Sequence, residues 1–156
     1  MMEELFAFLK ENHLTIAAME SFTGGLFAAQ MTAIPGCSSV FQGSLVTYND
    51  QAKIHLGQID PQVIKQYGAI SKECARDMAN QARALYDADI GVSFTGNAGP
   101  DGQEGKPAGL IYMAIASKHR VQVFEDQLKL SRNALRQRAV KSCCERILEI
   151  FRENGL

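Results

Sequence analysis

The stretch Met19-Glu20-Ser21-Phe22-Thr23-Gly24-Gly25 is the clearest starting point for interpreting this sequence. It follows a short apolar run, residues 14–18, and leads into a second apolar segment, residues 26–34. A strand, small polar residues, paired glycines and then a helix place free backbone N–H groups at a helix start, and such a start attracts anions and developing oxyanions. Ser21 stands at that junction, so we expect its hydroxyl to reach a ligand held by those N–H groups.

Outward from this stretch, strand and helix patterns alternate along the chain. Unbroken apolar runs and β-branched or aromatic residues predict strands, whereas apolar residues at helical spacing predict helices. The predicted strands are residues 14–19, 41–48, 90–94, 108–117 and 120–124, the last two as a hairpin. The predicted helices are residues 3–11, 26–34, 51–56, 61–67 and 72–86, followed by one that Ser131 caps and that runs to about residue 153.

Helical spacing selects one face on two of these helices. In the helix after the paired glycines, the residues that share a face are Leu26, Ala29, Gln30 and Ala33. In the last helix, the expected core stripe is Leu135, Ala139, Cys143, Ile147 and Phe151.

The order of these elements predicts an α/β layered fold with a mixed sheet, in one domain over residues 1–156. Polar, glycine-bearing stretches follow Met19, Tyr48 and Phe94, each at the carboxyl end of a predicted strand. In open α/β sheets that edge is where ligands bind. The functional site is therefore expected there.

Charge and composition exclude several classes of partner. The 16 basic and 17 acidic residues give a formal charge of −1, which offers no field to attract nucleic acid or an anionic membrane. No apolar run approaches the length of a membrane span, and the acidic, amphipathic N-terminus is unlike a signal peptide. We expect a cytoplasmic protein. Its four cysteines show no CxxC or Cys/His spacing, which predicts reduced structural thiols rather than a disulfide or zinc framework.

Most familiar catalytic arrangements find no support in this sequence. A Ser-His-Asp triad is disfavoured because His13, His55 and His119 all lie outside the glycine-bearing loops. There is no GxSxG, Walker or HExxH motif, and the glycine loop at residues 95–102 lacks the GxGxxG register. What remains is serine with lysine. A lysine can activate a hydroxyl only if burial lowers its pKa from roughly 10.4 toward neutrality. The alternative is ordinary glycine turns beside a solvated lysine.

Five collinear motifs carry a resemblance to a known family. They lie at residues 18–25 (AMESFTGG), 34–41 (IPGCSSVF), 46–53 (VTYNDQAK), 67–71 (YGAIS) and 95–102 (TGNAGPDG), and Lys106-Pro107-Ala108-Gly109 follows them. The first resembles the AESCTGG motif of the CinA C-terminal domain, the nicotinamide-nucleotide amidase family, and the others are similar to that family's motifs in the same order.

The resemblance implies an enzyme that hydrolyses the carboxamide of nicotinamide mononucleotide to nicotinate mononucleotide and ammonia, in the recycling of NAD breakdown products. It also implies a three-layer α/β/α domain with a mixed, mostly parallel five-stranded sheet, and it implies no metal or organic cofactor. By motif position the catalytic serine and lysine are Ser21 and Lys53. The oxyanion would be held by backbone N–H groups near Thr23, Gly24 and Gly25, or at Gly96.

Other motif positions become candidate binding residues. Ser38 is a rival nucleophile or a supporting hydroxyl, and Tyr48 either orients the lysine, stacks on the pyridinium or is only a strand-end aromatic. Nucleotide contacts are expected from Thr95, Ala98 and Gly99. Arg132 and Arg136 lie four residues apart at the start of the last helix, where they either bind the 5′-phosphate or form a solvated face.

The sequence also departs from the family pattern. Phe22 replaces a cysteine, Asn97 replaces an apolar residue, and Leu130-Ser131-Arg132 replaces a Gly-Asp-Arg pattern. None of them removes Ser21 or Lys53, so we expect them to bear on substrate choice and rate more than on reaction class. The second hypothesis is a paralogue that keeps the nucleotide pocket but serves as a binding or regulatory protein linked to competence or DNA damage. Longer family members carry an N-terminal molybdopterin-binding-like domain, which we do not expect here. We do expect a homo-oligomer.

Overall fold

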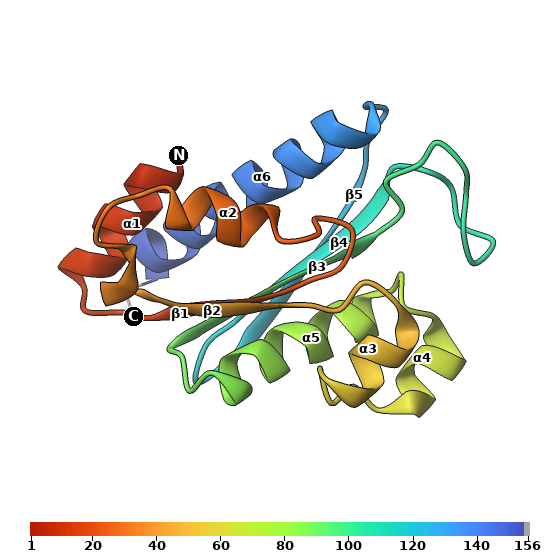
Figure 1. Cartoon of the computed structure of the whole chain (residues 1–156), viewed down its shortest axis with the longest axis horizontal. Coiled ribbons are helices and arrows are strands. Elements are labelled where there is room, and N and C mark those ends of the chain that lie inside the picture. The colour runs from red at the N-terminus through yellow and green to blue at the C-terminus, as the bar shows by residue number, and fades with distance from the viewer. Residues whose placement is uncertain (155–156) are drawn as a thin grey trace.

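The computed structural model describes residues 1–154 and shows one five-stranded sheet between two layers of helices (Figure 1). The strand order is β2-β1-β3-β4-β5; β1 pairs in parallel with β2 and β3, and the β4–β5 hairpin is antiparallel. This confirms the three-layer α/β fold with a mixed sheet. The strands are β1 Ile16–Glu20, β2 Phe41–Val46, β3 Ile90–Gly96, β4 Leu110–Ala116 and β5 Val121–Gln127. The helices are α1 Met2–Glu11, α2 Leu26–Thr32, α3 Asp50–His55, α4 Pro61–Tyr67, α5 Lys72–Leu85 and α6 Arg132–Asn154, with a 3₁₀ turn, η1, at Cys37–Ser39.

The register of the parallel strands determines where the site forms. Glu20, the last residue of β1, pairs with Val46 of β2 on one side and with Phe94 of β3 on the other. All five residues of β1 are buried. The apolar run predicted this for the first four residues, and Glu20 is buried as well. The segments that leave β1, β2 and β3 therefore emerge together at one edge of the sheet, as expected from the positions of the three glycine-bearing stretches.

Helices α1, α2 and α6 cover one face of the sheet (Figure 1). The predicted core stripe of α6 is confirmed. Four of its residues are fully buried, namely Leu135, Ala139, Cys143 and Ile147, and Phe151 packs against the same core. In α2 the buried residues are Phe27 and Met31, whereas Ala29 and Ala33 are exposed. The face that helical spacing selected on α2 is thus not the one that enters the core. The reason is the Phe27 ring, which packs 5.7 Å from that of Phe94.

Helices α3, α4 and α5 cover the other face, and α5 lies against β3 without a side chain between the two backbones. A Cβ atom added to Gly91 of β3 would lie 2.1 Å from the carbonyl oxygen of Ala79 on α5. Met19, Cys74 and Met78 fill the neighbouring part of this layer. The absence of a side chain at position 91 is therefore what lets the central helix approach the sheet.

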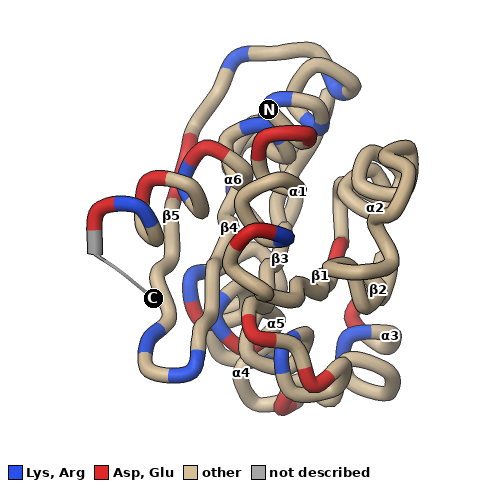
Figure 2. The backbone as a smooth tube through the Cα atoms, turned by 90° about the vertical axis from the view of Figure 1, so that its left-hand side faces the viewer, with Lys and Arg blue, Asp and Glu red and all other residues tan. Residues whose placement is uncertain are grey.

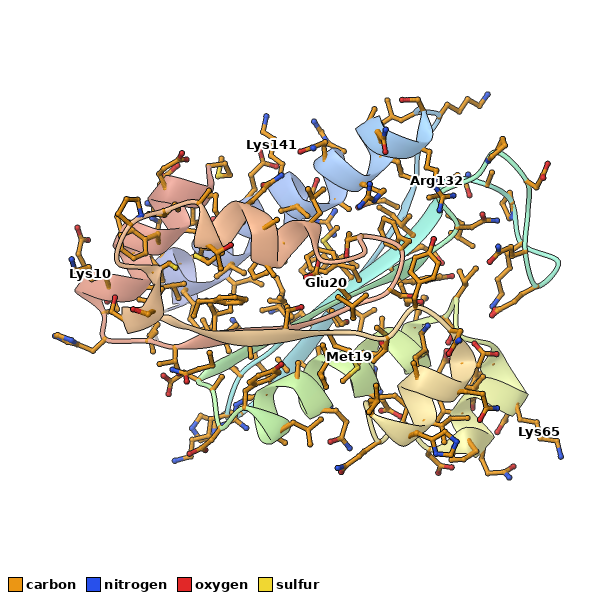
Figure 3. All side chains as sticks on the ribbon, viewed as in Figure 1. Lys10, Met19, Glu20, Lys65, Arg132 and Lys141 are labelled. Atoms are coloured by element: carbon orange, nitrogen blue, oxygen red, sulfur yellow. The ribbon has the colours of Figure 1, made fainter. Side chains whose placement is uncertain are left out.

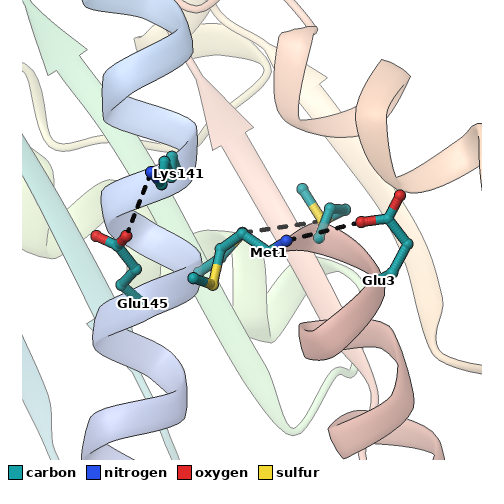
Figure 4. Close-up of polar contacts among 6 residues, drawn as sticks. Met1, Glu3, Lys141 and Glu145 are labelled. Atoms are coloured by element: carbon teal, nitrogen blue, oxygen red, sulfur yellow. Dashed lines mark hydrogen bonds and ion pairs between the residues drawn. The ribbon is translucent and has the colours of Figure 1, made fainter.

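Basic and acidic residues are interspersed along the backbone rather than gathered by sign (Figure 2). Figure 4 shows two surface ion pairs, from the N-terminal amino group of Met1 to Glu3 at 3.7 Å and from Lys141 to Glu145 at 3.9 Å. Such exposed pairs contribute little to stability. In the described part of the chain, no helix combines the length and hydropathy that crossing a bilayer requires.

Candidate active site

The centre of the site is a contact between Ser21 and Lys53. Ser21 follows β1 directly, and its backbone N–H continues the sheet by donating to the carbonyl of Phe94 at 2.9 Å. Lys53 lies in α3, which Asn49 caps by accepting from the backbone N–H of Ala52. Its amine, Nζ, lies 2.9 Å from Ser21 Oγ, and the Lys53 residue is only 2% exposed. Folding thus joins two groups 32 residues apart in a buried position.

Burial lowers the pKa of Lys53 below the 10.5 of an ordinary lysine, because the charged amine loses its hydration. Negative charge on Cys74, when its thiol is ionised, and on Asp50 and Glu104 raises the pKa of Lys53. Burial also raises the pKa of the Cys74 thiol to about 12, so Cys74 stays uncharged at neutral pH and only the two carboxylates oppose the shift. Lys53 also donates to the carbonyl of Thr47 at 2.9 Å, which fixes the direction of the amine. Once neutral, this amine can accept a proton from Ser21 across the same contact.

The turn after Ser21 is tight and depends on both glycines. Gly24 and Gly25 have φ angles of +59° and +98°, which side-chain-bearing residues rarely adopt. The backbone N–H of Gly24 donates to the carbonyl of Ser21 at 3.0 Å and closes the turn. Within residues 1–154, the backbone N–H groups of Phe22, Thr23 and Gly25 have no acceptor in the protein. Of these three residues only Phe22 lines a cavity beside Ser21, so its N–H is the one placed to meet a developing oxyanion.

The start of α2 is not an open anion site, contrary to the sequence-based expectation, because Glu20 already occupies it. The Glu20 carboxylate is fully buried and accepts from the backbone N–H groups of Phe27 at 2.8 Å and Ala28 at 3.3 Å. It also accepts from the Ser44 hydroxyl on β2 at 2.7 Å. Figure 3 shows Glu20 on the α2 side of the sheet, opposite to Met19. The sequence analysis missed this role; the available signal was an acidic residue ending an otherwise apolar strand just before a helix.

Two adjoining cavities open beside Ser21, and both are lined by Ser21, Tyr48, Gly96 and Gln103. The first, about 230 Å³ in volume, extends to Arg132, and we call it the Arg132 cavity. The second, about 190 Å³, contains Lys53, and we call it the Lys53 cavity. The Arg132 cavity is also lined by Phe22, Asn97, Ala98, Gly99, Pro100 and Asp101. The Lys53 cavity is also lined by Asp50, Ala69, Ile70, Thr95 and Glu104.

The loop between β3 and β4 forms one wall of both cavities and is tied to the segment between α4 and α5. Glu104 accepts from the backbone N–H of Ile70 with both carboxylate oxygens, at 3.1 and 3.2 Å. The amine of Lys106 donates to the carbonyls of Tyr67, at 2.9 Å, and Ile70. Asn97 closes the base of the loop by accepting from the backbone N–H of Gly99 at 3.2 Å. These contacts hold Gln103 and Glu104 over the cavities.

Several predicted binding residues do line the cavities. Tyr48 lines both, and its hydroxyl accepts from Arg132 at 2.8 Å. Arg132 also donates to the carbonyl of Gly99 at 2.7 Å (Figure 3). Thr95 is buried and donates its hydroxyl hydrogen to the carbonyl of Ala69 at 2.7 Å. Gly96 and Ala98 complete this group of predicted residues.

Other predicted residues lie away from the cavities. Ser38 is exposed in η1, before the start of β2, whereas Ser21 follows the end of β1; the two are separated by about one strand length, roughly 17 Å. Thr23 is fully buried, and neither it nor Gly24 or Gly25 lines either cavity. Arg136 does not line them either. The geometry therefore does not support Ser38 as nucleophile or Arg136 as a phosphate ligand.

The departures at positions 22 and 97 leave the site open. The Phe22 side chain is 5% exposed, belongs to the hydrophobic core under α2, and forms part of the Arg132 cavity wall. The Asn97 side chain donates to the carbonyl of Lys106 and accepts from the N–H of Gly99, so it binds the backbone of the loop and does not fill the cavity. Among residues 1–154, no three metal-ligating side chains converge.

Comparison with known proteins places this geometry in a wider context. The family model of the CinA C-terminal domain matches residues 1–151. A "putative competence-damage inducible protein" of Listeria monocytogenes serovar 1/2a is 44% identical over 153 residues, which cover 97% of this chain and 37% of the relative. A protein of the same description from Bacillus velezensis is 40% identical over 97% of this chain and 36% of the relative. The chain therefore spans about a third of the length of these curated relatives.

Two solved structures share the fold. The competence damage-inducible protein A (ComA) of Klebsiella pneumoniae superposes with a TM-score of 0.93 at 26% identity, covering 99% of each chain. The competence/damage inducible protein CihA of Agrobacterium tumefaciens superposes with a TM-score of 0.91 at 29% identity, covering 96% of this chain and 92% of that one.

Proposed function

The chain belongs to the CinA C-terminal domain family, and from this premise we propose that it is a serine amidase acting on nicotinamide mononucleotide. The products are nicotinate mononucleotide and ammonia. The observation that carries the proposal is the 2.9 Å contact between Lys53 Nζ and Ser21 Oγ, in a position that lowers the pKa of the lysine. A serine with a desolvated lysine is a known way to make a hydroxyl nucleophilic without histidine.

In the first half of the reaction, Ser21 Oγ attacks the carboxamide carbon while neutral Lys53 takes its proton. Negative charge develops on the carbonyl oxygen. Phe22 lines the Arg132 cavity, and its backbone N–H has no acceptor within the described chain, so this group is suited to donate to that oxygen. The C–N bond then breaks as Lys53 passes the proton to the amide nitrogen, which leaves as ammonia.

In the second half, water hydrolyses the acyl-enzyme. Lys53 takes a proton from the water as its oxygen bonds to the acyl carbon, and returns this proton to Ser21 as the ester bond breaks. The net change is one water consumed, one ammonia released and the enzyme restored.

The charges around the cavities support a substrate with a cation at one end and an anion at the other. Asp50 and Glu104 line the Lys53 cavity, where their negative charges would attract the positively charged pyridinium ring of the substrate. Arg132 lies at the far side of the other cavity, suited to a 5′-phosphate. The pyridinium charge also opposes protonation of Lys53, so the substrate favours the neutral form of its own base.

The test is release of ammonia from nicotinamide mononucleotide by the purified protein. Ser21→Ala and Lys53→Ala are each expected to lower kcat on the order of 10³-fold or more, because each removes a member of the reacting pair. Ser38→Ala is the matched control and should keep full activity.

Two outcomes would contradict the proposal. If Ser38→Ala abolishes turnover while Ser21→Ala only weakens it, the nucleophile is misassigned. Tight nucleotide binding without any ammonia release would instead favour the second hypothesis, a paralogue that serves as a nucleotide-binding or regulatory protein.

A further inference from the structure

The turn that carries Ser21 is held from two sides by charged side chains that do not line the cavities. We propose that Arg136 and Glu20 are positioning residues, which together fix the orientation of the peptide groups after Ser21, and that Arg136 does not bind the substrate phosphate. This inference rests on the proposed function for its kinetic test.

Arg136 reaches the turn from α6 and uses its guanidinium as a two-pronged donor. Its Nε donates to the carbonyl of Phe22 at 3.1 Å, and its Nη2 donates to the carbonyl of Thr23 at 2.7 Å. The third nitrogen, Nη1, donates to Asn133 at 3.2 Å. A Cβ atom added to Gly24 would lie 3.5 Å from Nη2, so the guanidinium packs directly on the turn. All three nitrogens are engaged with protein oxygens.

Glu20 holds the other end of the same turn. Through its bonds to the first backbone N–H groups of α2 and to Ser44, it joins β1, β2 and α2 around the segment from Ser21 to Gly25. Because Glu20 immediately precedes Ser21, a shift of its side chain would be transmitted to the nucleophile through one peptide bond.

The hydrogen bonds to the carbonyls of Phe22 and Ser21 determine the direction of the N–H groups that follow them. A peptide group is planar and trans, so a carbonyl that faces Arg136 directs the N–H of the following residue to the opposite side. The carbonyl of Phe22 faces Arg136, and the N–H of Thr23 is therefore directed away from α6. The carbonyl of Ser21 is bound by Gly24, which fixes the N–H of Phe22 in the same manner. Arg136 thus holds the two peptide groups that follow Phe22, and with them the turn that carries Ser21 and the N–H of Phe22, without lining either cavity.

Arginine is suited to this task and lysine is not, because only the planar guanidinium can donate along two fixed directions to successive carbonyls. Arg132, one helical turn earlier, provides the contrast. It lines a cavity and contacts Gly99 and Tyr48 of the cavity wall. The two arginines share a face of α6 but serve the site in different ways.

The experiment compares single variants of the full chain in steady-state turnover of nicotinamide mononucleotide. Arg136→Ala should lower kcat by on the order of 10- to 100-fold with KM within about twofold of wild type, because a misplaced reacting group costs rate rather than binding. Arg132→Ala should raise KM instead. Arg138→Ala, an exposed arginine two residues further along α6, is the matched control and should change neither. A raised KM with unchanged kcat for Arg136→Ala would overturn the inference, as would full activity in Arg136→Lys.

A second measurement does not depend on the substrate. The rate at which an alkyl fluorophosphonate labels Ser21, followed by intact mass, should fall at least about tenfold in Arg136→Ala and in Glu20→Gln, each confirmed as folded by circular dichroism. If wild type releases no ammonia but labels, the proposed function fails while this comparison still stands. Labelling at the wild-type rate in both folded variants would overturn the positioning roles.

Discussion

At the scale of single residues, the central feature is an amine kept nearly free of water. Lys53 acts as a base only when neutral, so kcat/KM should rise with pH and level off at an inflection below 10.5, because burial lowers the pKa of Lys53. Asp50→Asn removes an anion that raises this pKa, and should move the inflection to lower pH. The measurement is the pH profile of ammonia release. Glu3→Gln, on the distant surface of α1, is the control and should leave the profile unchanged. An inflection at or above 10.5 in wild type would contradict the assignment of Lys53.

The same burial makes Lys53 costly to the folded state. Because the unfolded chain binds the lysine proton more readily than the folded one, the free energy of unfolding should increase with pH between the lowered pKa of Lys53 and 10.5. In Lys53→Met the free energy of unfolding should not show this increase with pH, because the titrating amine is gone. We expect it to be more stable than wild type at pH 7 by roughly 0.5–2 kcal/mol, with the difference shrinking as the pH approaches 10.5. Urea unfolding at several pH values would check this; a difference independent of pH would contradict it.

Sequence could predict some of these residues and not others. The strand ends and glycines predicted that Ser21 lies at the ligand-binding edge of the sheet, and the family resemblance singled out Lys53 as its partner. The hydrogen bond between the two residues agrees with that pairing. The spacing of Arg132 and Arg136 predicted a shared helix face but could not show that the second meets backbone carbonyls of another element. Glu20 was missed although it is an acidic residue at the end of an apolar strand, because the sequence does not show which backbone N–H groups a carboxylate will bind.

At the scale of elements, the backbone approach of α5 to β3 leads to a stability prediction. In Gly91→Ala the new methyl group would meet the carbonyl of Ala79, which cannot rotate away, and the loss should be about 3 kcal/mol. Gly105 is the matched control, since a Cβ there meets nothing within 4 Å. Gly105→Ala should lose only about 1 kcal/mol, from its positive φ. Urea unfolding of both would check this, and equal losses would contradict the packing explanation.

The order and approximate bounds of the elements were predictable from apolar periodicity and from breakers such as Pro35-Gly36. The η1 turn and the buried face of α2 were not. Both faces of the short helix α2 carry apolar residues, so the sequence pattern did not show which face is buried. The buried face is the one that packs the ring of Phe27 against those of Phe41 and Phe94. Three-dimensional contacts of this kind have no local signature.

At the scale of the whole molecule, the site combines segments from both helical layers and from the sheet edge. Lys53 comes from a helix of one layer, Arg132 from a helix of the other, and Ser21 directly follows strand β1 between them. A ligand that bridges the two cavities should therefore stabilise the whole fold. Nicotinate mononucleotide at about 100 times its Kd should add about 2.7 kcal/mol, which corresponds to roughly 5–10 °C in Tm. Arg132→Ala should reduce the shift measured by calorimetry at the same concentration, while Arg138→Ala should retain it. An unchanged Tm for wild type at millimolar product would contradict the site.

The dry surroundings of Lys53 come largely from parts of the chain that follow it. Ala69, Ile70 and Thr95 line its cavity, and Cys74 of α5 lies near its amine. A nascent or half-folded chain therefore already contains the serine and the lysine but gives the lysine an ordinary, protonated amine. If Ser21 and Lys53 react as proposed, the hydroxyl becomes nucleophilic only when the later segments pack over the earlier ones, and incompletely folded copies should not attack amides or esters.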